Sequence, residues 1–240
     1  MSVLRDGLDA LGFGGGSFCG MPTRPLAELA DAMEAYIRVL QEHNARFDLV
    51  NADGHDEIAV RHVLDSLSAL PALCRELSAR TAGGLLVADI GSGAGLPGIP
   101  LAAALPGVPF VLVERMAKRC GFLRHAAGAL SLGNVSVEEN QVERLEQNRF
   151  DAAVFRAFRP LDKKMTKVLL RILKDGGILA AYKAKKEKIA EEMAAIPQRP
   201  EYAVIPLTVP FLTENTESGE ARERNLVVIK KRWTFAQNGV

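Results

Sequence analysis

The pattern of hydrophobic and polar positions changes character near residue 80. Before that point, apolar residues recur at spacings of three and four over residues 26–43 and 56–77, which predicts two amphipathic helices. Pro71 is expected to break or kink the second of them. Residues 23–80 are therefore interpreted as a helical extension, and the glycine-rich residues 1–22 ahead of it predict a flexible tail.

After residue 80, short apolar runs alternate with helical patterns. The segments that predict strands are 85–90, 110–114, 135–139, 151–155 and 177–182, and those that predict the helices between them are 97–105, 116–131 and 160–174. This alternation indicates an α/β fold whose mostly parallel sheet is covered by helices on both faces.

The last two apolar runs, 203–209 and 225–231, have only a polar loop between them. Strands without a crossover helix pair antiparallel, so these runs predict a C-terminal hairpin at the edge of the sheet. The chain is then divided into a tail (1–22), the helical extension (23–80), a sheet-containing domain (81–232) and a C-terminal tail (233–240).

Composition places the chain among globular proteins of a reducing compartment. Of its 240 residues, 48% are apolar, which suits one large domain with an extension and excludes a wholly disordered chain. The three cysteines are too few and too widely spaced for a disulfide framework. Because the N-terminus lacks the apolar run of a signal peptide and no run approaches about 18 apolar residues, we expect a cytoplasmic protein with no membrane contact.

The net charge of +1 conceals an uneven distribution of charge. Residues 156–188 carry eleven basic and three acidic residues, a local charge of +8, which leaves −7 for the rest of the chain. A second basic group lies within residues 115–124. Such a surface binds polyanions even when the whole molecule is neutral, although solvated helix faces are the alternative interpretation.

Residues 87–100, VADIGSGAGLPGIP, predict a nucleotide-cofactor site. A strand ends at Ile90, the chain turns through three alternating glycines, and a helix is expected to begin near Pro97. Glycines at this place let a ligand approach the backbone next to the helix N-terminus. Asp89 precedes the loop and Glu114 ends the next strand, where a carboxylate suits a ribose diol.

Two cofactor classes use such a loop. Gly93-x-Gly95-x-x-Gly98 matches the spacing of the dinucleotide motif, but it begins too late after the strand. An NAD-dependent oxidoreductase nevertheless stays as an alternative, although Tyr182 directly before Lys183 does not give the Tyr-x-x-x-Lys spacing. The Asp-x-Gly-x-Gly-x-Gly order followed by Glu114 resembles the S-adenosylmethionine loop of class I methyltransferases. The structural alternative for Asp89 is a loop-satisfying carboxylate, one that accepts hydrogen bonds from backbone groups of the loop. For Glu114 the alternative is an acid at the surface, at the end of a strand.

Several motifs in one order make the resemblance more specific: RHVLDS (61–66), DIGSGAGLPGIP (89–100), KR (118–119), FRAF (155–158) and LVVIKK (226–231). Together, over residues 25–232, they closely resemble the bacterial small-subunit ribosomal RNA guanine-N7 methyltransferases, long called glucose-inhibited division protein B. The resemblance implies a class I S-adenosylmethionine-dependent methyltransferase (Rossmann-like) fold that methylates a guanine of 16S rRNA near the decoding centre. It also implies the 16S rRNA or the 30S particle as partner and no metal, and we expect a monomer. A methyltransferase with another substrate and a non-catalytic RNA-binding protein are the alternatives.

The resemblance also assigns cofactor residues, which join the acids and glycines of the loop. The expected cofactor-binding set is Asp89, Gly91, Gly93, Gly95, Leu96, Glu114, Val142, Glu143 and Arg156. Arg156 ends a parallel strand, so it is expected to contact the cofactor or the target nucleotide, or else to form a structural ion pair with an acid such as Asp89. His62 and Asp65, three apart on one helix face, are expected to brace the extension against the cofactor loop.

Guanine N7 attacks through an exposed lone pair, so no strong general base is required and the catalytic task is mainly alignment. No catalytic residue is assigned; Arg156 is the positioning candidate. The residues expected to contact RNA phosphates are Lys118, Arg119, Arg124, Arg159, Lys163, Lys164, Lys183, Lys185 and Lys186. Phe158 is the candidate for stacking on a base, and Phe155 is expected in the core.

Overall fold

The computed structural model describes residues 2–52, 54–78, 80, 84–197, 199–212 and 222–232. Its centre is a seven-stranded sheet with the order β5-β4-β3-β6-β7-β9-β8. The strands are β3 (Val87–Ile90), β4 (Phe110–Glu114), β5 (Val135–Glu139), β6 (Phe150–Arg156), β7 (Leu173–Lys183), β8 (Tyr202–Pro206) and β9 (Asn225–Lys230). The pairs from β5 through β7 are parallel, and β9 runs antiparallel to both β7 and β8. The parallel sheet and the C-terminal hairpin are confirmed.

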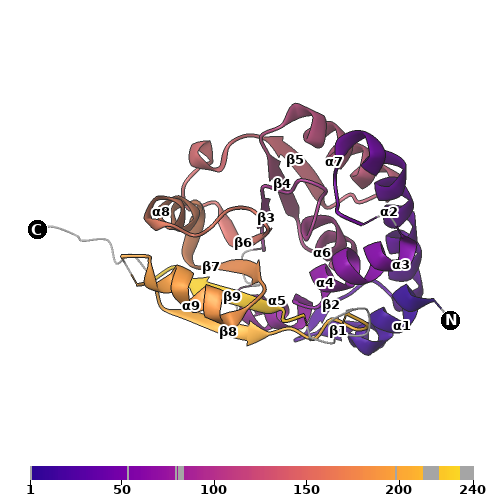
Figure 1. Ribbon diagram of the computed structural model, residues 1–240, viewed down its shortest axis with the longest axis horizontal. Coiled ribbons are helices and arrows are strands. Elements are labelled where there is room, and N and C mark those ends of the chain that lie inside the picture. Colours follow the sequence, from indigo (N-terminus) through magenta and orange to yellow (C-terminus); the bar gives the residue numbers. More distant parts are fainter. Residues whose placement is uncertain are drawn as a thin grey trace, which may run out of the picture.

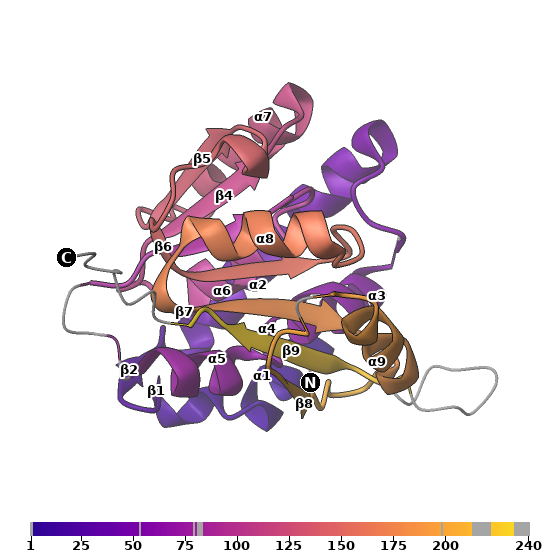
Figure 2. The same cartoon turned by 90° about the vertical axis from the view of Figure 1, so that its left-hand side faces the viewer.

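Alternate residues of each strand enter two separate cores, because successive side chains point to opposite faces of a sheet. Val87 and Leu112 pack with the N-terminal helices, α6 (Gly98–Ala104) and α7 (Ala117–Ala129). Ala88 and Val113 pack with α8 (Lys163–Ile172) and α9 (Lys186–Ala194). Figures 1 and 2 show these two helical layers on either side of the sheet. The outcome is a three-layer α/β/α sandwich.

The extension is helical, as expected, and its second helical stretch is interrupted. The first stretch is α2 (Leu26–Phe47), which packs on α6 and α7. The second consists of α3 (His55–Ile58), a π-helical segment (Ala59–Leu64), α4 (Asp65–Leu67) and α5 (Leu70–Leu77). A two-residue turn at 68–69 separates α4 from α5, just before Pro71. π-Helical turns are rare and are frequently found at functional sites, and this one carries Arg61 and His62.

The prediction of a flexible tail over residues 1–22 is wrong for the described residues 2–22. This segment forms α1 (Val3–Ala10), a 3₁₀ turn (Phe13–Gly15) and a small hairpin of β1 (Ser17–Phe18) and β2 (Met21–Pro22). Leu4, Leu8 and Phe13 are fully buried in the core shared with the extension. Glycines here form the turns between packed elements, so their number does not indicate freedom of the whole segment. The tail expected at 233–240 lies outside the described residues.

Helix α9 has no counterpart among the predicted elements. It follows β7 and buries Ile189 and Met193 against the sheet. Its other residues are lysine, glutamate and alanine, so its apolar stripe is narrow. Across the part of the chain that the structure describes, no helix is both long and apolar enough to span a bilayer.

Candidate functional site

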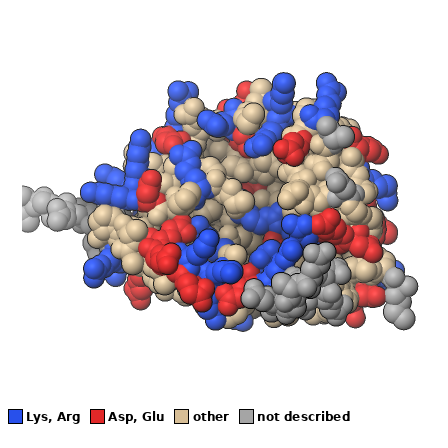
Figure 3. Space-filling model, in the orientation of Figure 1, with Lys and Arg blue, Asp and Glu red and all other residues tan. Residues whose placement is uncertain are grey.

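Two adjoining cavities open at the carboxyl ends of the parallel strands. The first, cavity 1, has a volume of about 460 Å³, and the second, cavity 2, about 790 Å³. The residues that line both are Gly91, Arg119, Ala157, Phe158 and Arg159. Figure 3 shows the hollow near the middle of one face, with lysine and arginine side chains around it. Ligands of open α/β sheets collect at this edge, so the cavities are the candidate site.

The glycine loop between β3 and α6 forms the junction of the two cavities. Gly91, Gly93 and Gly95 have φ values of +67°, +55° and +87°, which residues with a side chain rarely adopt. A Cβ atom on Gly91 would lie 2.4 Å from the Phe158 ring, and one on Gly95 would lie 2.4 Å from Ile99. The loop therefore needs glycine both for its backbone conformation and for close packing, as its sequence predicts.

Asp89 supports the loop from behind. Its side chain is fully buried and lines neither cavity, and its Oδ2 accepts the Gly98 N–H at 3.0 Å. Its Oδ1 is buried without a hydrogen-bond partner, and burial raises the pKa of this carboxyl to about 7. These contacts match the alternative of a loop-satisfying carboxylate. Any contribution of Asp89 to cofactor binding is therefore through the shape of the loop.

Glu114 is the principal charged group of cavity 1. Its side chain is 4% exposed, and it accepts backbone N–H groups of Gly93 (3.1 Å), Arg115 (2.8 Å) and Met116 (3.0 Å). These three bonds hold the carboxylate against the loop at the end of β4. An ionised carboxylate has about four acceptor sites, so one further donor is accommodated on the side that faces the cavity.

The opposite wall of cavity 1 comes from the segment after β5. Val142 begins a 3₁₀ turn and lines the cavity beside Glu143. The Glu143 carboxylate lies 3.8 Å from the Arg159 guanidinium, which also stacks over the Phe158 ring at 5.0 Å. The structure thus brings the predicted residues Gly91, Glu114, Val142 and Glu143 to one cavity, whereas Leu96 and Arg156 line cavity 2.

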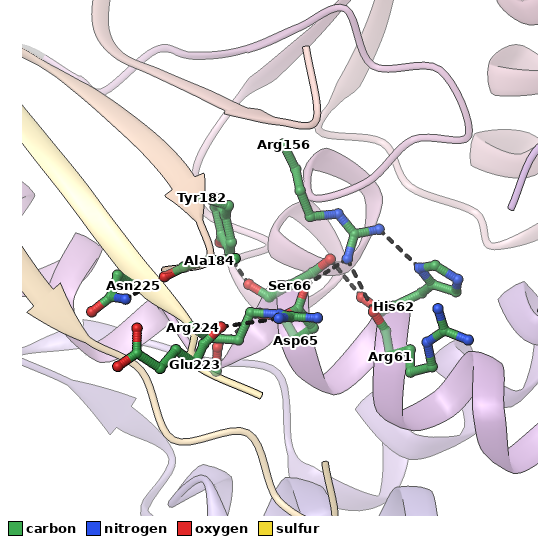
Figure 4. A network of polar contacts seen from close by, with 11 residues as sticks. Arg61, His62, Asp65, Ser66, Arg156, Tyr182, Ala184, Glu223, Arg224 and Asn225 are labelled. Carbon is green, nitrogen blue, oxygen red and sulfur yellow. Dashed lines mark hydrogen bonds and ion pairs between the residues drawn. The ribbon is translucent and has the colours of Figure 1, made fainter. Parts of the chain in front are cut away.

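Cavity 2 has a buried ionic network along one wall (Figure 4). Asp65 is 3% exposed, and its two oxygens accept from two guanidinium groups: Arg156 Nη1 at 2.6 Å and Arg224 Nε at 2.8 Å. Arg156 also donates to the Arg61 carbonyl at 3.2 Å and to His62 Nδ1 at 3.1 Å. The structural ion pair considered for Arg156 therefore exists, with Asp65 in place of Asp89. Two arginines on one carboxylate leave an excess positive charge beside the cavity.

The network also fixes the protonation of His62. A guanidinium only donates, so the Nδ1 atom of His62 must accept and its Nε2 must carry the hydrogen. Burial and, next, the Arg156 charge lower the pKa of His62 to about 3. His62 is thus a neutral imidazole that orients Arg156. With Asp65 it braces the extension against Arg156 at the end of β6, and not against the cofactor loop as expected.

Two buried tyrosines attach the helical extension to the site. The Tyr36 hydroxyl in α2 donates to the Ala94 carbonyl of the glycine loop at 2.5 Å. The Tyr182 hydroxyl in β7 donates to the Ser66 carbonyl at 2.6 Å. The sequence showed both tyrosines, but nothing local indicates that they join segments so far apart in the chain.

The residues expected to bind RNA follow the carboxyl ends of successive strands, so most lie at the edge of the sheet that holds the cavities. Lys118, Lys163, Lys164, Lys185 and Lys186 are exposed there. Arg119 and Arg159 line both cavities, and Lys183 lines cavity 2. Arg124 lies apart, in a separate shallow cavity beside β5. Phe155 is 1% exposed and in the core, as expected, although it also borders cavity 2, whereas Phe158 lines both cavities.

The sequence did not point to Arg224 or Glu192, both of which line cavity 2. Arg224 directly precedes β9, far from the motifs around the loop, and Glu192 lies in the helix that was not predicted. Neither has a local pattern that distinguishes it from a surface charge. In the described part of the chain, no three His, Cys, Asp or Glu side chains gather as a metal site.

Comparison with known proteins decides the family. The family model described as rRNA small subunit methyltransferase G matches residues 29–226. The chain belongs to this family. A ribosomal RNA small subunit methyltransferase G of Treponema denticola is 36% identical over 229 residues, covering 85% of this chain and 87% of the relative. One of Stenotrophomonas maltophilia is 37% identical, with 85% and 87% covered. The resemblance given by the motifs is confirmed, and with it the S-adenosylmethionine-dependent methyltransferase class.

Solved structures support the fold. A tRNA (m1A58) methyltransferase of Aquifex aeolicus superposes with a TM-score of 0.50 at 16% identity, covering 69% of this chain and 70% of its own. The [4+2]-cyclase SpnF reaches a TM-score of 0.54 at 14% identity, with 85% and 95% covered. At this level of identity the likeness concerns the fold alone, which is the class I methyltransferase fold.

Proposed function

We propose that the protein transfers the methyl group of S-adenosylmethionine to N7 of a guanine in 16S ribosomal RNA near the decoding centre. The observation that carries the proposal is the pair of adjoining cavities, one built on Glu114 and the glycine loop, the other bordered by basic side chains. Family membership supports both the cofactor and the class of RNA.

The residues of cavity 1 suit the chemistry of the cofactor. The Glu114 carboxylate, already fixed by three backbone N–H groups, would accept from one ribose hydroxyl at its remaining acceptor site. Val142 offers an apolar surface for the adenine, and Gly91 and Gly93 let the methionyl part pass close to the backbone towards cavity 2. Arg156 and Leu96 would meet that part from the side of cavity 2.

When bound, S-adenosylmethionine supplies an activated methyl group on a sulfonium, which a neutral guanine N7 attacks with its lone pair. The protein residues then have to align the base, because no proton leaves N7 during the attack. Good alignment in such systems contributes about 7–11 kcal/mol to the lowering of the barrier. Arg156, fixed by Asp65 and His62, is placed to position the cofactor or the target nucleotide without acting as a base.

The exposed lysines around the cavities would contact RNA phosphates, with Phe158 as the aromatic surface for the base. We further propose that the protein acts in the cytoplasm as a monomer, on the 30S particle or an rRNA intermediate of its assembly.

The decisive test is a methylation assay with S-adenosylmethionine and small subunits from cells that lack this activity. We expect N7-methylguanosine at one position of the 16S rRNA, mapped by chemical cleavage at the modified base. Parallel reactions on naked 16S rRNA and on 30S particles identify the substrate form. Equilibrium dialysis with S-adenosylmethionine and NAD gives the cofactor, and binding of NAD alone would contradict the proposal. A modified base other than guanine would do so as well.

A further inference from the structure

We propose that Glu192 and Lys183 select guanine in cavity 2. The Glu192 Oε2 atom, which has one acceptor site left, would accept the N1–H and N2–H groups of the base in one bifurcated hydrogen bond, and the Lys183 ammonium would donate to O6. This inference rests on the proposed function and adds the residues that distinguish guanine from the other bases.

The two side chains form one fixed unit on the wall of cavity 2. Lys183 ends β7, and α9 carries Glu192 back across the end of that strand. The Lys183 Nζ atom lies 2.8 Å from Oε1 and 2.9 Å from Oε2 of Glu192, and both side chains are about four-fifths buried. The backbone N–H of Leu161 also donates to Glu192 Oε1. The carboxylate and the ammonium therefore face the cavity with little freedom to rotate.

Of the described residues that line cavity 2, only Asp65 and Glu192 are acidic. Asp65 is nearly inaccessible, and each of its oxygens already accepts from an arginine. Glu192 Oε2 has Lys183 as its one hydrogen-bond partner among the described residues, so it retains acceptor capacity. Glu192 is thus the carboxylate of this cavity that a ligand can reach.

The donors and acceptors of the pair match the Watson–Crick edge of guanine. That edge presents the O6 acceptor next to the N1–H and N2–H donors. A protein that binds it must therefore offer one hydrogen-bond donor for O6 and, beside it, an acceptor that takes both hydrogens. Adenine presents a donor and then an acceptor, in the reverse order, and lacks the 2-amino group. An ammonium beside a carboxylate therefore favours guanine, and a misplaced base would leave buried polar groups without partners.

The position of the pair in the fold also leaves N7 on the correct side. The strand order β3-β6-β7 places the end of β7 two strand spacings, about 10 Å, from the glycine loop after β3. N7 is on the edge of the purine opposite N1 and N2. A base whose Watson–Crick edge meets Glu192 would therefore direct N7 away from α9, towards the loop at the junction with cavity 1.

The test compares target RNA carrying guanosine with RNA carrying inosine at the methylated position, since inosine lacks only the 2-amino group. With the wild-type protein, we expect inosine to lower kcat/KM about tenfold. Glu192→Gln should lower kcat/KM on guanosine about 10- to 100-fold and reduce the inosine penalty to less than threefold. Lys183→Met should lower activity on both RNAs by a similar factor, because both bases carry O6.

Glu191→Gln is the matched control, because it removes the same charge from the exposed face of α9. It should retain wild-type activity and the wild-type inosine penalty, and all variants should bind S-adenosylmethionine within about twofold of wild type. A wild-type protein that methylates inosine as well as guanosine would overturn the inference without any variant. So would Glu192→Gln with an unchanged inosine penalty. Failure of the wild-type protein to form N7-methylguanosine would instead overturn the proposed function itself.

Discussion

Cavities 1 and 2 share five residues but are built in different ways. The polar groups of cavity 1 come from short segments that each follow a strand: the glycine loop, Glu114 and residues 140–143. Cavity 2 is lined by side chains from α4, β6, β7, α9 and the residue just before β9, and Asp65 of α4 joins Arg156 of β6 to Arg224. The first depends on local backbone conformation, and the second on tertiary packing. Changes in the two cavities should therefore affect cofactor binding and stability in different proportions.

The largest expected effect concerns the centre of cavity 2. Asp65→Ala would leave Arg156 and Arg224 as partly buried cations without their shared carboxylate, and breaking a buried pair costs about 3–5 kcal/mol. The free energy of unfolding, measured in urea, should fall by about that amount. Glu57→Ala removes the carboxylate from the ion pair with Arg61, which is much more exposed than the Asp65 network. It should lower the free energy of unfolding by less than about 1 kcal/mol. Equal losses in the two variants would contradict the structural role of Asp65.

Cavity 1 should respond in cofactor affinity more than in stability. Glu114→Gln removes the charge that the ribose hydroxyl would meet, and hydrogen bonds to charged groups contribute about 1.5–3 kcal/mol. We expect the affinity for S-adenosylmethionine to fall about 10- to 100-fold in isothermal titration calorimetry. Glu139→Gln, an exposed acid at the end of the neighbouring strand β5, is the control and should leave affinity unchanged. An unaltered affinity in Glu114→Gln would place the ribose elsewhere.

The junction of the cavities should be sensitive to a single methyl group. Gly91→Ala forces a left-handed conformation on alanine, which costs about 1–2 kcal/mol, and places its Cβ against Phe158. Thermal unfolding should show a lower Tm and calorimetry a weaker cofactor affinity. Gly133→Ala has open space around the added Cβ and should change neither quantity. The double variant with Phe158→Ala should recover only the part due to the steric contact.

The last expected effect, which is small at neutral pH, is on the pH dependence of stability. Because the pKa of His62 is lowered to about 3 in the folded protein, the unfolded chain binds the extra proton between about pH 6.5 and 3. His62 therefore makes the free energy of unfolding fall with decreasing pH in that window, by at most about 1.4 kcal/mol per pH unit. His62→Gln should have a shallower dependence between pH 6.5 and 4.5. Parallel curves for the two proteins would show that His62 titrates in the folded state.

The sequence predicts cavity 1, which is built from local segments, better than cavity 2, which depends on tertiary packing. The strands, the glycine loop and the meeting of Gly91 with Glu114 were predictable, because a parallel sheet brings the segments after its strands to one edge. Val142 and Glu143 were expected there only because the resemblance to the family assigns them. The partner of Arg156 was not, because Asp65 and Arg224 meet it only through the packing of distant elements.

Two errors have a related cause. The N-terminal glycines predict a flexible backbone, but the buried side chains of Leu4, Leu8 and Phe13 together supply enough apolar surface to hold the segment in place. Helix α9 lacks a clear apolar pattern because only two of its nine residues are buried. In both cases a few side chains decide the structure through contacts with distant parts of the chain.

The insertion of β9 between β7 and β8 has a consequence for biosynthesis. While the protein is being translated, the glycine loop, Glu114 and residues 140–143 emerge well before Arg224. Until β9 is made, β7 lacks its antiparallel neighbour, and Asp65 has Arg156 as its only guanidinium partner within this network. The order of synthesis therefore delivers all the described residues that line cavity 1 before the last one that lines cavity 2. A chain truncated before β9 would retain the cofactor loop and still lack a finished wall for the base.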